Sequence, residues 1–225
     1  TTNSTIINNM VLSTSDYAMY LNDFDNTDIF HNTSLGEPGI RINEQEAADI
    51  RNNIFASTGD YAFESDGALG SGDVVNYNLY YSPVALPLHV GLNDFANLRD
   101  WKVADPSNNV NSLEGDPIFA SASDLHIEGA LANESGDNSV GVTIDVDGDT
   151  RPSGGATIVD IGADEYVPPV CPQVAGFTVD VLGFNDVTFS FENIGDSYEV
   201  EVGTCGFAQG TGAGTIYTGV DPFTI

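Results

Sequence analysis

Three carboxylates at alternate positions are the best candidates for metal chemistry in this sequence. Asp145, Asp147 and Asp149 have the spacing with which a calcium-binding loop begins. An EF-hand loop also requires Gly at its sixth position and Glu at its twelfth, whereas here the Gly is fourth and the twelfth residue is Ala. The alternative, which we favour, is that one of these Asp residues pairs with Arg151 and closes an end of the fold against solvent. Ca²⁺ is therefore the one candidate cofactor.

Aromatic side chains offer a second kind of chemistry, because exposed rings stack on the faces of sugars. The candidate carbohydrate-binding residues are Tyr77, Tyr80, Tyr81 and Trp101. The alternative for the tyrosines is that they form the interior stack and rim of the fold, which is the commoner place for such a cluster.

The charge of the chain limits its partners. The sequence contains 34 Asp and Glu against 5 Lys and Arg, which gives a net charge of −29. Nucleic acid is excluded because a phosphate backbone requires a basic surface, and anionic lipids and polyanionic polysaccharides are repelled unless cations bridge them. Carboxylates attract divalent cations, but most of these charges indicate solubility in a salty extracellular medium. No apolar run is long enough to insert into a membrane.

A repeat must position these residues. An Asn that follows a β-branched residue by three positions recurs at intervals of 23, 21 and 25 residues, at Asn9, Asn32, Asn53 and Asn78. A second short segment recurs in step with it and places large apolar side chains at Met19, Ile40 and Phe63. Because turn formers separate these short segments and long 3.6-periodic apolar runs are absent, the pattern predicts a parallel β-helix.

The recurring Asn has a structural explanation. Asn tolerates left-handed backbone geometry, so it suits a tight corner between strands, and stacked amides bond to one another as a ladder. The functional alternative is that Asn8, Asn52 and Asn76 line a sugar-binding face.

The period breaks after residue 91. Apolar residues at positions 92, 95, 98 and 101 predict a short amphipathic helix that is capped by Asn93 or Asp94. We expect this helix to lie across an outer face or a turn of the solenoid, with Trp101 as its anchor.

Several motifs follow in order: Gly-Asp-Pro-Ile-Phe at 115–119, Asp-Leu-His-Ile at 124–127, Asp-x-Asp-Gly-x-x-Arg-Pro at 145–152 and Asp-Ile-Gly-Ala-x-Glu-Tyr at 160–166. With them, residues 75–166 resemble the last coils of bacterial secreted right-handed parallel β-helix proteins, which are pectate-lyase-like solenoids. The resemblance implies a cell-surface protein of several domains. We expect the chain to be the C-terminal part of such a solenoid and a piece of a longer protein.

The second part of the chain has a different sequence pattern. We expect residues 1–166 to form the β-helix with its C-terminal cap and residues 167–170 to form a stiff Pro-rich linker. Alternating strands in residues 171–225 resemble the start of a fibronectin type III module, which is an incomplete β-sandwich. Cys171 and Cys205 are the only two cysteines, and a single pair in a chain of extracellular character predicts one disulfide. The fold class is all-β.

Two classes of function compete. The first is a structural or adhesive segment of an extracellular or cell-surface protein. Its β-helix would be a rigid stalk or a glycan-binding face, and its partners would be polysaccharides or other surface or secretion-system proteins. The second is a polysaccharide lyase or glycoside hydrolase with its active site on the β-helix face, partly in missing N-terminal coils. A lyase of this fold needs a Lys or Arg base beside Ca²⁺, but Arg41 and Arg51 are isolated in the sequence, and Arg41 points outward. A hydrolase needs paired carboxylates, for which Asp49 and Asp73 are weak candidates, so no catalytic residue is assigned.

Overall fold

The computed structural model describes residues 4–84 and 86–167 and, beyond them, five strands between residues 178 and 224. The chain divides into two compact units, Thr1–Pro168 and Pro169–Ile225, which are described separately. No helix in the described part of the chain is long and apolar enough to cross a membrane.

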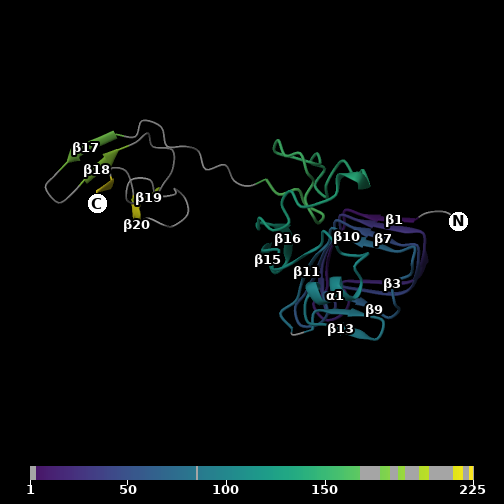
Figure 1. The fold of residues 1–225 in the computed structure, drawn as a ribbon. Coiled ribbons are helices and arrows are strands. Elements are labelled where there is room, and N and C mark those ends of the chain that lie inside the picture. The colour runs from purple at the N-terminus through teal and green to yellow at the C-terminus, as the bar shows by residue number, and fades with distance from the viewer. Residues whose placement is uncertain are drawn as a thin grey trace. The chain divides into compact units, whose positions relative to one another are not determined.

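The first unit winds through four coils, and each coil contributes one strand to each of three sheets (Figure 1). Sheet A consists of β1 (Ser4–Ile7), β4 (Thr27–Phe30), β7 (Asp49–Arg51) and β10 (Val74–Asn76). Sheet B consists of β2 (Met10–Leu12), β5 (Thr33–Gly36), β8 (Ile54–Ser57), β11 (Leu79–Tyr81) and β14 (Leu113–Glu114). Sheet C consists of β3 (Met19–Asp25), β6 (Ile40–Glu46), β9 (Phe63–Ser65), β12 (Leu88–Val90) and an antiparallel β13 (Asn93–Phe95). The prediction of a mostly β, parallel solenoid is confirmed.

Inward-facing residues of successive coils fill the interior of the solenoid. In sheet A, Ile29, Ile50 and Val75 lie in register and are fully buried. In sheet C the register places a second column of core residues at Met19, Ile40, Phe63 and Leu88. Because side chains alternate along a strand, the residues next to these columns face outward.

The predicted Asn ladder is present. Asn9 Nδ2 donates to Asn32 Oδ1 (2.8 Å), Asn32 Nδ2 donates to Asn53 Oδ1 (3.0 Å), and Asn53 Nδ2 donates to Asn78 Oδ1 (3.0 Å). Each backbone N–H of the first three Asn residues donates to the same acceptor as the side chain. Asn32, Asn53 and Asn78 are inaccessible to solvent, so the ladder links the coils from inside.

The left-handed backbone geometry lies one residue earlier than the sequence predicts. The residue before each ladder Asn has a positive φ, and these four residues form what we call the corner column: Asn8 (53°), His31 (53°), Asn52 (60°) and Tyr77 (52°). Since the chain turns at the corner column, each ladder Asn immediately precedes a strand of sheet B and points its amide inward.

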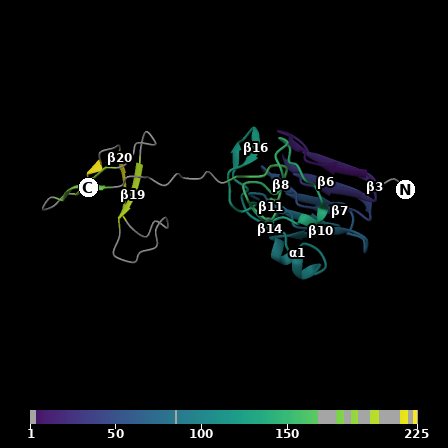
Figure 2. The ribbon, with the colours of Figure 1, turned by 90° about the horizontal axis from the view of Figure 1, so that it is seen from above.

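A short helix closes the last coil. The helix α1 (Leu98–Ala104) begins at Asn97, whose side chain accepts the N–H of Asp100, and not at Asn93 or Asp94. The predicted helix start was wrong because residues 93–95 pair with β12 as strand β13 instead. Trp101 is buried in the main core, so α1 packs against the end of the solenoid (Figure 2) and does not lie on an outer face.

The remaining elements of the first unit are short. They are the antiparallel pair β15 (Phe119–Ser121) and β16 (Asp124–Ile127) and one turn of 3-10 helix, η1 (Asn138–Val140).

The second unit contains two small antiparallel sheets. One holds β17 (Thr178–Leu182), β18 (Val187–Ser190) and β21 (Phe223–Thr224), and the other holds β19 (Tyr198–Val202) and β20 (Thr215–Gly219). The expected disulfide between Cys171 and Cys205 lies outside the described residues.

The ladder should dominate the stability of the solenoid. Asn53→Ala removes the acceptor of two buried N–H groups of Asn32, and the loss should lower the free energy of unfolding by about 3 kcal/mol. Asn43→Ala is the matched control, because the Asn43 amide also bonds an Asn of the neighbouring coil, Asn22, but at an exposed site. Urea unfolding followed by circular dichroism measures both. Equal losses in the two variants would contradict the role of the buried ladder.

Candidate functional site

The segment of residues 137–166, which we call the clasp, lies along the corner column. Asn52 Nδ2 donates to the Asp137 carbonyl (2.9 Å), and the Asp137 N–H donates back to Asn52 Oδ1 (2.8 Å). Asn8 Nδ2 donates to the carbonyl of Ile144 (2.7 Å). The Asn76 side chain in turn accepts the N–H of Asn111 (2.8 Å). These amides are used to hold covering segments, so they do not form the sugar-binding face that was the alternative for Asn8, Asn52 and Asn76.

The motif at residues 160–166 supplies the buried contacts of the clasp. Arg151 is buried and pairs with Glu165 (2.7 Å), and its other nitrogen donates to the Gly162 carbonyl (2.9 Å). Gly162 has φ of 107°, and a Cβ there would lie 2.6 Å from Ile54 Cδ1 and 2.9 Å from Thr33 Oγ1. The prediction that an Asp of the 145–149 run pairs with Arg151 was wrong. The carboxylate that neutralises this guanidinium comes instead from the last motif, which folds against it.

The three predicted metal ligands have different roles. Asp145 is buried, and its two oxygens accept the N–H groups of Asp147, Asp149 and Glu165 at 2.8–3.1 Å, so it organises a turn. Asp147 is exposed and bonds His126 Nε2 (2.8 Å). Asp149 is exposed.

A different set of residues converges. Within residues 4–84 and 86–167, one group of three His, Cys, Asp or Glu residues has its ligand atoms within 4.8 Å of one another, namely His126, Asp147 and Asp164. The hydrogen bond to Asp124, together with Asp147, raises the pKa of His126 to about 9. Both ring nitrogens therefore carry protons at neutral pH and hold carboxylates, so a metal ion would have to displace a proton to bind this imidazole.

His31 is the titratable group most enclosed by the clasp. It is fully buried, with Nδ1 3.2 Å from the Gly162 carbonyl and Nε2 2.9 Å from Asn52 Nδ2. Burial, aided by the charge of Arg151, lowers the pKa of His31 to about 3. The neutral ring therefore donates from Nδ1 and accepts at Nε2, and protonation would break the contact with Asn52.

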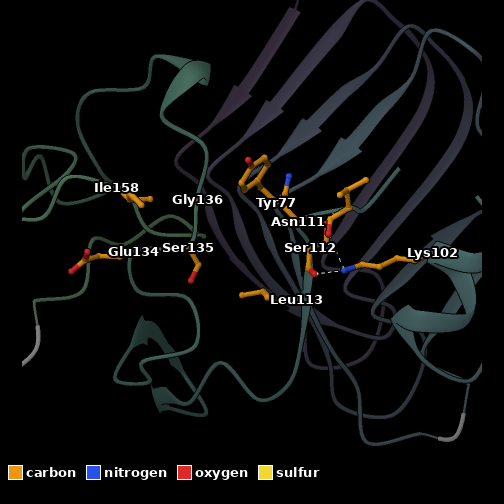
Figure 3. Close-up of a pocket in the computed structure, with 10 residues that line it drawn as sticks. Tyr77, Lys102, Asn111, Ser112, Leu113, Glu134, Ser135, Gly136 and Ile158 are labelled. Atoms are coloured by element: carbon orange, nitrogen blue, oxygen red, sulfur yellow. Dashed lines mark hydrogen bonds between the residues drawn. The ribbon is translucent and has the colours of Figure 1, made fainter. Parts of the chain in front are cut away.

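Two of the predicted sugar-stacking residues are core residues. Tyr80 is fully buried, and Trp101, at 1% exposure, packs against Phe63 and Tyr80, although its edge lines a small cavity of about 210 Å³. A ring without an exposed face cannot stack on a sugar, so these two assignments were wrong. Tyr81 is half-buried against the core of sheet B. Tyr77 is half-buried and lines an open cavity (Figure 3).

The outer face of sheet C carries the densest array of functional side chains. The five strands place one outward residue each in a single register, which we call the outer row: Tyr20, Arg41, Glu64, His89 and Asp94. Because neighbouring strands are about 4.8 Å apart, this row is about 19 Å long. Tyr20 is 51% exposed, whereas the residues beside it in sequence face the core.

Contacts along the outer row hold its side chains in place. The Arg41 guanidinium lies 5.4 Å from the ring of Tyr17 and 6.0 Å from that of Tyr20. It donates hydrogen bonds to Asp66 at 2.9 Å and forms an ion pair with Glu64 at 3.6 Å. The bonds to Asp66 raise the pKa of Arg41, so this group stays protonated and cannot act as a base.

The other end of the outer row is a second fixed cluster. His89 Nδ1 lies 2.6 Å from Asp94, and the Tyr61 hydroxyl donates to the same carboxylate (3.0 Å). The rings of Tyr61 and His89 are 5.2 Å apart. Bonds from His89 and Tyr61 lower the pKa of Asp94, whereas burial raises the pKa of Glu64.

The sequence repeat predicts which residues align in the outer row. The repeat aligned on Ala18, Gly39 and Ala62 places Tyr20, Arg41 and Glu64 two residues later in each coil. The expectation that Arg41 points outward is confirmed. Only the fold shows that it is not isolated, because its neighbours come from other coils.

The clasp should make stability depend on pH through His31. Its pKa is about 3 in the folded chain and 6.5 when exposed, so the unfolded chain takes up the proton first, and stability is lost as pH falls below about 6.5. Between pH 7 and pH 5 the wild type should lose about 2 kcal/mol more than His31→Asn, in which the corner keeps a residue type found in two other coils. Urea unfolding at both pH values measures this. Parallel losses in the two proteins would exclude His31 as the cause.

Chelation tests the calcium alternative. Since backbone N–H groups already satisfy Asp145, we expect the melting temperature to be the same with and without EDTA. Asp149→Asn is the matched control, because it removes an exposed carboxylate of the same run. A fall in melting temperature on chelation that Asp149→Asn abolishes would instead establish Ca²⁺ at this turn.

No protein-family model, no curated protein and no solved structure matches this chain. The resemblance of residues 75–166 to bacterial surface β-helix proteins therefore remains an expectation, while the solenoid is shown by the structure. The function has to be inferred from the geometry of the described residues.

Proposed function

We propose that this chain is a rigid, adhesive segment of an extracellular or cell-surface protein, and that the outer face of sheet C is its glycan-binding face. The observation that carries the proposal is the outer row, in which aromatic, cationic and acidic side chains follow one another at the spacing of the strands. A face with an exposed ring, that of Tyr20, and fixed hydrogen-bonding groups suits an extended polysaccharide.

The charges of this face favour an uncharged glycan. The single guanidinium is paired with Asp66 and Glu64, and Asp94 adds another carboxylate. A polyuronate would meet net negative potential across the face, as the chain has a net charge of −29. Neutral sugar hydroxyls can donate to these carboxylates while the rings of Tyr20 and Tyr61 provide apolar contact.

Rigidity supports the structural part of the proposal. The Asn ladder ties successive coils together inside, the clasp ties three of them together outside, and α1 covers the last coil. Binding to a face that is already ordered costs little conformational entropy. We extend the proposal to residues 171–225 as a fibronectin type III-like module with a Cys171–Cys205 disulfide, on the support of alternating strands and a single cysteine pair.

One observation favours glycoside hydrolysis as a second candidate function. Glu64 and Asp94 lie on the same row two strands apart, so their backbones are about 9.5 Å apart. This spacing can accommodate the carboxylate separation of inverting glycosidases, roughly 6.5–9.5 Å. Their pKa values move in opposite directions, as an acid and a base require. Glu64 would protonate the leaving oxygen, and Asp94 would activate water.

Binding to insoluble neutral and acidic polysaccharides tests the first proposal. We expect retention on a neutral glycan, and Tyr20→Ala should weaken binding about three- to tenfold, the value of one exposed stacking contact. Val74→Ala is the control, because Val74 is similarly exposed, at 43%, but on sheet A. Exclusive retention on polyuronates, or equal binding by both variants, would contradict the proposed face.

The same glycan panel distinguishes binding from catalysis. If the second candidate holds, new reducing ends will accumulate and Glu64→Gln will abolish them while leaving retention intact. Unsaturated products would indicate a lyase and would contradict both assignments, since Arg41 is held as a cation.

A further inference from the structure

An open cavity of about 480 Å³ lies between α1, residues 110–113, residues 134–136 and Tyr77 of the corner column, with Ile158 of the clasp at its edge. Figure 3 shows Tyr77 at its upper wall, Lys102 on one side and Ser135 on the other. The volume lies within the range of small-molecule sites, about 300–1,000 Å³. This cavity is formed by other elements than the outer row, so a ligand here would be independent of the proposed glycan face.

Lys102 is the unusual group in this cavity. It is half-buried, and its Nζ donates to the carbonyls of Ser112 (2.8 Å) and Val110 (3.3 Å). Among the side chains that the structure describes, no carboxylate lies within salt-bridge distance of Lys102. The three buried or half-buried guanidinium groups, Arg41, Arg51 and Arg151, are all paired, and only the exposed Arg99 among the described arginines is not. Burial lowers the pKa of Lys102, because no neighbouring anion compensates for the lost hydration.

The one carboxylate among the residues that line this cavity does not serve this ammonium. Glu134 also lines the cavity, but Figure 3 shows it on the opposite wall with its oxygens directed away from Lys102. A chain with 34 acidic residues thus leaves one ammonium without an anion at the wall of a cavity. Two of its three N–H groups are used, and the third is available to a ligand.

The other walls suit a sugar ring. The aromatic ring of Tyr77 provides a stacking surface, and the amide of Asn111 and the hydroxyl of Ser135 line the same space. Val110 and Ile158 add apolar contact. We infer that this cavity binds a small sugar acid, with the carboxylate of the ligand on Lys102 and the ring of the ligand against Tyr77.

Titration calorimetry with D-glucuronate and D-glucose tests the inference on the full chain. We expect glucuronate to bind at least tenfold more tightly than glucose, and Lys102→Gln should abolish this difference because it keeps a donor for the Ser112 carbonyl but loses the charge. Lys102→Arg should retain the difference. The unfolding midpoint of each variant reports any purely structural role of the bonds to residues 110 and 112.

Tyr77→Asn provides a second, matched variant. Asn occupies the same corner position in two other coils with the same left-handed backbone, so the fold should be retained while the ring is lost. This variant should lose binding of both sugars. Equal affinity for glucose and glucuronate, unchanged binding in Lys102→Gln, or no saturable binding at all would overturn the inference. Tyr20→Ala, on the outer row, should bind glucuronate like the wild type, which separates this site from the glycan face.

Discussion

The amide ladder from Asn9 to Asn78, which is buried from Asn32 onward, is the interaction on which the rest of the structure depends. Asn32, Asn53 and Asn78 each accept two N–H groups from the preceding coil, so the coils are joined in one register. A slip by one residue would expose the core column and would leave buried donors without acceptors. The register of all three sheets follows from this, including the alignment of outward side chains into rows.

A solenoid must also shield the core of its last coil and the polar groups at its corners from solvent. Here α1 places Trp101 over the core of the last coil, and the clasp covers the corner column with segments that have almost no regular secondary structure. Buried charges supplement the backbone hydrogen bonds of the clasp, since Arg151 and Glu165 neutralise each other and bond the surrounding main chain. A paired buried charge is costly to disrupt, so the motifs of residues 145–166 act as structural fasteners. This explains why residues that resemble a calcium loop make turns here.

The clasp covers one side of the solenoid and leaves the outer face of sheet C open to a ligand. The corner column lies under the clasp, and Arg51 of sheet A is tied to Asp137 there. The outer row of sheet C remains accessible at Tyr20 and Asp94. Repetition brings residues that are about two dozen positions apart in sequence to neighbouring positions on one face, so a binding surface can be built from one residue per coil.

The sequence alone predicts the period, the solenoid, the inward columns and the Asn ladder, because each depends on one residue type that recurs at the same step. It also indicated that Arg41 points outward, since alternation along a strand is a local property. The folded structure was needed to show that Arg151 pairs with Glu165, that His31 lies beneath Gly162, 131 residues away, and that Tyr80 and Trp101 are core residues. These features depend on which distant segment covers which face, and that is fixed by packing between segments that are far apart in the sequence.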